Sequence, residues 1–302
     1  MTIGSSPLPL ESPAASLVLP RMFAYLELTK PRVNLLVTLT AAAGFYMGSR
    51  GSVDLIALLQ TVIGTGLIAA GSAALNQYME RGLDARMTRT AGRPLPSGRL
   101  TPAAALIFGL VLTILGAIYL AAFVNFLSSG LGLLTSFLYL LIYTPLKTRT
   151  PLCTAVGAVP GAIPPLIGWA AAANNLDLGA AGLFLILLLW QFPHFLAISW
   201  AYRRDYREGG FSMLSSVDPE GARTAWRILV YSAFLILVSF LPAVLSISGD
   251  LYLTGAALLG ISLLAYGIQA ARVRSRSAAR QLSLATVVYL PVLLLLMVAD
   301  KV

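Results

Sequence analysis

Three oxygen-bearing side chains recur at intervals of four residues in one stretch of the chain: Asn76, Glu80 and Asp84. In an α-helix these positions drift by only about 80° around the axis and span about 12 Å, so they form one stripe. Hard cations such as Mg²⁺ prefer oxygen ligands and often bind through a few carboxylates together with substrate phosphates. The spacing therefore indicates a magnesium site on one face of a helix.

Arginines follow this stripe closely, among them Arg89 and Arg93. Guanidinium groups bind phosphate oxygens well, often through two hydrogen bonds at once. Acids and arginines together predict a diphosphate site, in which Mg²⁺ bridges carboxylates to phosphate and arginine takes the remaining charge. The alternative interpretation is that the acids only form ion pairs with neighbouring arginines. Asn76 weighs against it, because a polar residue inside an apolar helix usually has a function.

A second cluster of acids and arginines follows much later in the chain. Arg203, Arg204 and Asp205 lie just after an apolar segment, with Glu208 close behind, and we expect Asp205 to be a metal ligand. Glu208 can equally be a solvated loop charge. Lys147, in a loop between the two clusters, is predicted to reach the same diphosphate; its alternative is an ordinary charge that orients a membrane protein.

The composition places these clusters in a membrane protein. The 302 residues are 58% hydrophobic and only 11% charged, with a mean hydropathy of +0.82, whereas soluble domains carry about 25% charged residues. Nine apolar segments are long enough to cross a hydrocarbon core of about 30 Å. They lie near residues 30–49, 54–79, 102–124, 127–146, 152–173, 179–201, 223–247, 251–272 and 281–299.

The segments are continuously apolar rather than alternating, which excludes a β-barrel and requires helices in lipid. We therefore predict an all-α polytopic protein with nine transmembrane helices. Residues 21–302 form a single domain, and residues 1–20, rich in Ser, Pro, Leu and Ala, form a flexible cytoplasmic N-terminal tail.

Positive charge is distributed very unevenly between the two ends of such a bundle. Nineteen Lys and Arg residues fall on the side of the N-terminal tail, and only two, Arg50 and Lys301, fall on the other. Positively charged loops stay in the cytoplasm. Both acidic clusters are therefore predicted to be cytoplasmic, and the odd number of helices puts the C-terminus outside.

Other classes of protein fit the sequence less well. A nucleic-acid-binding role lacks a basic, aromatic-rich soluble domain, and the single Cys153 excludes an intrachain disulfide or a cysteine metal cluster. A CDP-alcohol phosphotransferase would need paired aspartates soon after Asp84, but the next acid is Asp177. A transporter would favour charges near mid-membrane, whereas these acids gather at one face.

The motifs resemble those of the UbiA-type intramembrane prenyltransferases, and within them the branch that farnesylates haem. The stripe is similar to the first acidic motif of that family, NDxxDxxxD, with Gln77 and Glu80 in place of aspartates. Gly209 occupies the place of the second acid in the later DxxxD motif. The stretches that match the haem branch, in order and spacing, are residues 84–96, 143–147, 157–169, 190–195 and 205–214.

This resemblance implies a nine-helix bundle around a central cavity, in a bacterial-type plasma (inner) membrane. It implies transfer of the farnesyl group of farnesyl diphosphate to the 2-vinyl group of protohaem IX (haem B), giving haem O and diphosphate. Mg²⁺ is the expected cofactor, haem B is a substrate, and a haem A synthase or an oxidase-assembly protein is a partner by resemblance alone. The nearest alternative is another ring acceptor, such as a quinone precursor.

The site residues can then be assigned roles. The expected metal and diphosphate ligands are Asn76, Glu80, Asp84 and Asp205, and the expected diphosphate contacts are Arg89, Arg93, Lys147, Arg203 and Arg204. The only histidine, His194, lies eleven residues before Asp205, which places it about 16 Å deeper along a helix. That depth suits contact with a buried porphyrin; the alternative is a hydrogen-bonded interior histidine.

Overall fold

The computed structural model describes residues 13–302. The predicted tail, 1–20, falls mainly outside this range, and its last residues belong to α1 (Pro13–Leu28). The other elements, in chain order, are α2 (Pro31–Gly48), α3 (Leu55–Asp84), α4 (Pro102–Phe123), α5 (Phe126–Phe137), the π-helix η1 (Leu138–Tyr143), α6 (Thr144–Leu146), α7 (Cys153–Ala162), α8 (Pro164–Ala173), α9 (Leu178–Ala201), α10 (Arg203–Glu208), the 3₁₀ turn η2 (Leu214–Ser216), α11 (Ala222–Ser239), α12 (Leu241–Val244), α13 (Asp250–Val273) and α14 (Arg276–Ala299).

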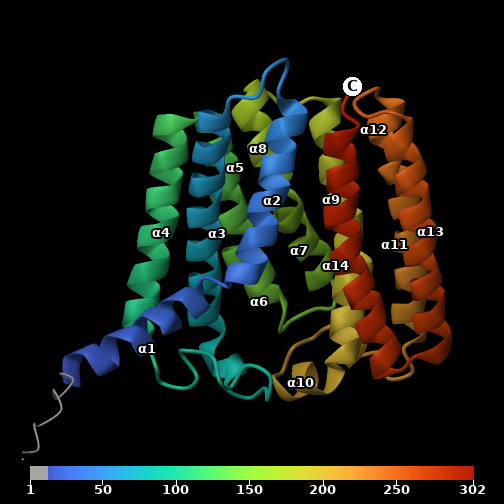
Figure 1. The fold of residues 1–302 in the computed structure, drawn as a ribbon. Coiled ribbons are helices and arrows are strands. Elements are labelled where there is room, and N and C mark those ends of the chain that lie inside the picture. The colour runs from blue at the N-terminus through green and yellow to red at the C-terminus, as the bar shows by residue number, and fades with distance from the viewer. Residues whose placement is uncertain (1–12) are drawn as a thin grey trace, which may run out of the picture.

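The long helices stand side by side as a bundle, as the sequence predicts (Figure 1). Within residues 13–302, eight helical spans are long and apolar enough to cross a membrane. The ninth predicted span is α2, which has 18 residues. Arg32 and Asn34 near its start lower its mean hydropathy, yet it packs between α3 and α8 inside the bundle.

Helix starts are fixed by side chains that satisfy free backbone N–H groups. The carboxylate of Asp54 accepts hydrogen bonds from the backbone of Ile56 and Ala57 at the start of α3, at 2.9 and 3.0 Å. Asp177 caps α9 in the same way. These caps fix the starts of α3, which carries Asn76, Glu80 and Asp84, and of α9, which carries His194.

The span formed by α7 and α8 is broken at Ile163, in the run of Gly and Pro that the sequence shows there. The break lets α8 pack against α2 at close range. A Cβ atom on Gly168 would lie 1.8 Å from the carbonyl oxygen of Ala41, and one on Gly44 would lie 2.0 Å from that of Pro165. Only glycine permits this approach.

A π-helical turn interrupts the span of residues 126–146 just before its end. Such turns shift the register of the residues that follow, and they occur often at functional sites. Here the hydroxyl of Thr144 donates a hydrogen bond to the carbonyl of Tyr139, five residues earlier, at 2.8 Å. The turn brings Thr144 and Lys147 to face α3.

The two ends of the bundle differ. The end of α3, α6 and α10 gather at the end where α1 lies, and the C-terminus lies at the opposite end beside α12 (Figure 1). All the predicted site loops therefore share one end of the molecule.

Candidate active site

The oxygen stripe occupies the last three turns of α3. Asn76, Glu80 and Asp84 are buried, with exposed fractions of 1%, 5% and 1%. Burial of two carboxylates at the end of an apolar helix is costly unless each is paired. The structure places a cation beside every member of the stripe.

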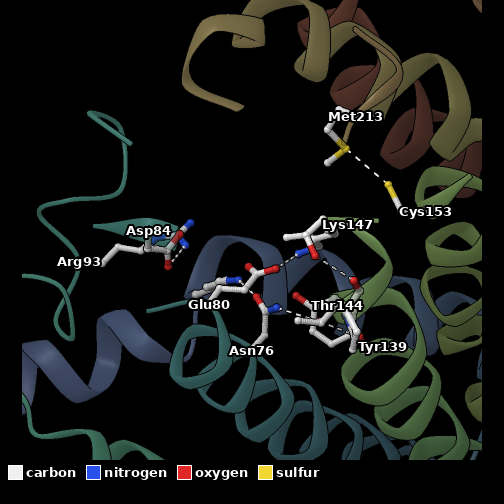
Figure 2. Close-up of polar contacts among 12 residues, drawn as sticks. Asn76, Glu80, Asp84, Arg93, Tyr139, Thr144, Lys147, Cys153 and Met213 are labelled. Atoms are coloured by element: carbon white, nitrogen blue, oxygen red, sulfur yellow. Dashed lines mark hydrogen bonds and ion pairs between the residues drawn. The ribbon is translucent and has the colours of Figure 1, made fainter. Parts of the chain in front are cut away.

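Three segments far apart in the sequence supply these cations (Figure 2 shows the pairs with Glu80 and Asp84). The three contacts are Lys30 Nζ to Asn76 Oδ1 at 3.1 Å, Lys147 Nζ to Glu80 Oε1 at 2.7 Å, and Arg93 Nη1 to Asp84 Oδ2 at 2.7 Å. The stripe is therefore the point at which the α1–α2 junction, the loop after α3 and the loop after α6 converge.

The amide of Asn76 has a defined orientation. The hydroxyl of Thr144 donates its one proton to the carbonyl of Tyr139. Thr144 Oγ1 must therefore accept the hydrogen bond from Asn76 Nδ2, at 3.1 Å. The amide oxygen of Asn76 then accepts the hydrogen bond from Lys30 Nζ. Asn76 thus presents an oxygen atom, the kind of ligand that a magnesium ion prefers.

The pair of Glu80 and Lys147 is the most enclosed of the three, with 7% and 10% of the side chains exposed. Burial opposes the charged form of Lys147, but the Glu80 carboxylate and its hydrogen bond outweigh burial and raise the pKa of Lys147. The ammonium also lies 4.6 Å from the centre of the Tyr143 ring. Lys147 therefore keeps its positive charge inside the site.

Asp84 has one oxygen bonded and one free. Its Oδ2 accepts from Arg93, while its buried Oδ1 has no hydrogen-bond partner among residues 13–302. An unpartnered buried carboxylate oxygen is costly. With the oxygens of Glu80 and Asn76 on the same stripe, it forms a donor set that suits a hard cation.

The second cluster lies next to the first. The guanidinium of Arg89 stacks over the rings of Tyr202 and Tyr206, with distances of 5.2 and 5.6 Å to the ring centres. The backbone N–H of Ser212 donates to the carbonyl of Lys147 at 2.7 Å. The loops after α3, α6 and α10 therefore form one continuous surface at this end of the bundle.

Within that surface, Asp205 lies on the short helix α10, after the end of α9. It is partly exposed and forms no ion pair in the part of the chain described. Arg203 stacks on the ring of Trp200 at 4.4 Å, and Arg204 and Glu208 are exposed. No three His, Cys, Asp or Glu side chains of residues 13–302 lie close enough to hold an ion by themselves. The role of Asp205 as a metal ligand stays a prediction.

His194 is partly exposed on α9, where its ring stacks on that of Trp190. The expectation of one helix from His194 to Asp205 is wrong, because α9 ends at Ala201 and α10 begins at Arg203. The backbone of Tyr202 between them is not helical. Seven residues of helix, a rise of about 10 Å, separate His194 from Ala201, where α9 ends, so the rise of about 16 Å to Asp205 does not follow.

Residues 37–291 match the UbiA prenyltransferase family. The chain is 49% identical to a protoheme IX farnesyltransferase of Solibacter usitatus over 286 residues, which is 92% of this chain and 98% of that protein. It is 41% identical to a protein of the same name from Koribacter versatilis, over 92% of this chain and 93% of that protein. The chain belongs to the UbiA prenyltransferase family.

Solved structures agree with this prenyltransferase in fold. A digeranylgeranylglyceryl phosphate synthase has a TM-score of 0.76 at 19% identity, covering 93% of this chain and 98% of that one. A UbiA homologue from Archaeoglobus fulgidus, solved bound to DMAPP and Mg²⁺, has a TM-score of 0.63 at 14% identity, covering 89% and 98%. At these identities the likeness establishes the fold alone, and it confirms the predicted helical bundle.

Lys30 lies beside the stripe of α3, a position that the sequence did not predict. It adopts the left-handed conformation, with φ of 49°, at the junction of α1 and α2. Burial, together with the nearby positive charges of Arg93 and Lys147, lowers the pKa of Lys30 to about 7. The negative charge of a bound diphosphate would favour the charged ammonium form of Lys30. The only sequence signal was its position before Pro31, which marks a turn but does not say what the turn faces.

We expect Lys30→Met to weaken binding of farnesyl diphosphate about 10-fold or more, because a charge-assisted hydrogen bond contributes about 1.5–3 kcal/mol. The measurement is a binding titration with detergent-solubilised protein. Arg99→Met is the control, since Arg99 lies at the same end in an exposed ion pair with Glu27. Equal affinities of the two variants would remove Lys30 from the site.

Proposed function

We propose that this prenyltransferase transfers the farnesyl group of farnesyl diphosphate to the 2-vinyl group of protohaem IX. The proposal rests on two relatives named protoheme IX farnesyltransferase, each of which matches 92% of this chain. The single structural observation that supports it is the buried stripe of α3, where two carboxylates and an amide oxygen each meet a cation from a different segment. A site with both acids and cations is what a metal-bound diphosphate requires.

We infer that Mg²⁺ is held by Asn76, Glu80 and Asp84, with Asp205 as the ligand from the second cluster. When bound, the ion supplies Lewis-acid stabilisation of the charge that develops on the departing diphosphate. The free Oδ1 of Asp84 and the oriented oxygen of Asn76 support this assignment. The UbiA homologue from Archaeoglobus fulgidus has been solved with Mg²⁺ and DMAPP and with Mg²⁺ and GPP, which supports a metal-dependent prenyltransferase.

The cations of the site have a separate task. Lys30, Arg93 and Lys147 lie at the stripe itself, and Arg89 lies on the surface between the two clusters. Fixed positive groups lower a barrier most where negative charge grows during reaction. We assign these four to the oxygens of the diphosphate, and Arg203 and Arg204 to its outer edge.

The bond changes balance without a protein nucleophile. The bond from farnesyl C1 to oxygen breaks, and its electrons leave with diphosphate. The outer carbon of the haem 2-vinyl group bonds to C1, and the cation left on the inner vinyl carbon takes hydroxide from water, which releases a proton. The protein's part is to hold both substrates, neutralise the leaving group and limit water until the bond has formed.

The protein is an integral, multi-pass membrane protein. We propose that it lies in a bacterial-type plasma (inner) membrane with α1 and the site in the cytoplasm and the C-terminus outside. The charge bias between the two ends supports this orientation, as does the position of the C-terminus at the end opposite the site (Figure 1). A haem A synthase or an oxidase-assembly protein is the partner that we propose from resemblance.

The function is tested by mass spectrometry of haem extracted after purified protein has reacted with haem B, farnesyl diphosphate and Mg²⁺. We expect haem heavier by one farnesyl group and one hydroxyl group, which add to the two carbons of the vinyl double bond. Removal of Mg²⁺ with a chelator should abolish the product, and added Mg²⁺ should restore it. Unmodified haem, with farnesylation of a quinone precursor offered in parallel, would instead support the alternative acceptor.

A further inference from the structure

Two side chains, Trp190 and Thr286, hold His194 in place, and none of the three belongs to the proposed diphosphate site. His194 Nδ1 lies 2.7 Å from the hydroxyl oxygen of Thr286 on α14. The indole N–H of Trp190 donates to the backbone carbonyl of Thr286 at 2.8 Å. The rings of Trp190 and His194 stack, with centres 4.8 Å apart and planes 14° from parallel. The imidazole is therefore held on both its face and its edge.

The hydrogen bonds determine which ring nitrogen carries the proton. Thr286 Oγ1 lies 2.6 Å from the carbonyl oxygen of Ser283, and a carbonyl can only accept, so the hydroxyl proton must lie between them. Thr286 can then only accept from His194. The proton of the neutral imidazole must be on Nδ1, which leaves Nε2 with a free lone pair.

That lone pair has no hydrogen-bond partner in the part of the chain that the structure describes. Among residues 13–302, Nε2 makes no hydrogen bond, and the side chain of His194 is partly exposed. An interior histidine with a structural role usually has both ring nitrogens bonded. A histidine whose Nδ1–H is held by an acceptor, with Nε2 bare, is instead the arrangement of metal-binding histidines.

We propose that Thr286 is a positioning residue that holds His194 in the tautomer whose Nε2 binds the iron of the haem substrate. The proposal rests on the proposed function, since it takes haem as the acceptor. Trp190 contributes by fixing both partners, because it stacks on the ring and bonds to the backbone of Thr286. The ring thus needs little reordering when haem binds.

The test is a titration of the full-length protein with haem, followed by the Soret band. We expect Thr286→Val to weaken haem binding about 10- to 100-fold, the usual cost of losing the partner that orients a metal-binding histidine. Thr286→Ser keeps the hydroxyl and should restore binding. His194→Gly should lose the Soret band of the wild-type complex, and added imidazole should restore that band. The imidazole should restore it equally in the double variant His194→Gly with Thr286→Val.

The matched control is Thr61→Val. Thr61, like Thr286, is 0% exposed and bonded to a carbonyl of its own helix, but it lies in the first half of α3, away from His194. It should bind haem as the wild type does. Binding of farnesyl diphosphate, measured in every variant, reports whether the fold is intact.

The outcomes separate the two proposals. Wild-type protein that binds no haem would overturn both the function and the role of Thr286. If haem binds with the same Soret band and affinity to the wild type, His194→Gly and Thr286→Val, the role of Thr286 is overturned while the function stands. Equal losses in Thr286→Val and Thr286→Ser would also overturn it, because the hydroxyl would then not be the group that matters.

Discussion

Asp84→Asn is expected to lower the turnover number for farnesyl transfer at least about 100-fold, the usual scale for loss of a group that stabilises charge in a transition state. The change removes one negative charge and almost no volume. Asp84 supplies the unpartnered oxygen of the stripe and is only 1% exposed. The measurement is initial rate of farnesylated haem formation in membranes containing equal amounts of folded protein.

The control for this change lies on the same helix. Asp54 caps the other end of α3 and is exposed, and Asn caps a helix about as well as Asp. Asp54→Asn should therefore be active and stable. Near-normal turnover of Asp84→Asn would remove Asp84 from the mechanism, whatever the control does.

Lys147→Met is expected to destabilise the protein by about 3–5 kcal/mol, because it leaves the Glu80 carboxylate buried without its cation. It should also abolish transfer. The change is measured as a lower midpoint of thermal denaturation in detergent, alongside activity at a temperature where the variant is folded.

The double variant Glu80→Gln with Lys147→Met separates structure from function. Replacing both charges removes the unpaired carboxylate, so most of the lost stability should return. Activity should not return, because both a metal ligand and a diphosphate contact are missing. A double variant that regained activity together with stability would mean that this pair only holds the loop after α6 against α3.

The stripe was predictable from sequence because it depends on the geometry of a single helix. Four-residue spacing puts Asn76, Glu80 and Asp84 on one face of any α-helix, and the structure shows that this face is the buried one. Gln77, one position on, lies off the stripe; its amide donates to the carbonyl of Leu28 and fixes α3 to α1. Gln77, which stands in place of an aspartate of the family motif, therefore has a structural contact of its own.

The pairing of segments was not predictable, because it depends on turns whose direction cannot be read from the pattern of residue types. Lys30, which contacts Asn76, is itself the left-handed residue of the turn between α1 and α2. Lys147 was predicted near the diphosphate, but the π-turn that aims it at Glu80 has no signature in the hydrophobic pattern. The non-helical residue Tyr202 likewise ended the helix that was expected to join His194 to Asp205.

The central claim is that the stripe of α3 binds a diphosphate through Mg²⁺. It is tested most directly by equilibrium binding of farnesyl diphosphate to wild-type and Asp84→Asn protein, each with Mg²⁺ and with a chelator. The account predicts tight binding only for the wild type with Mg²⁺. Equal affinity in all four conditions would contradict it.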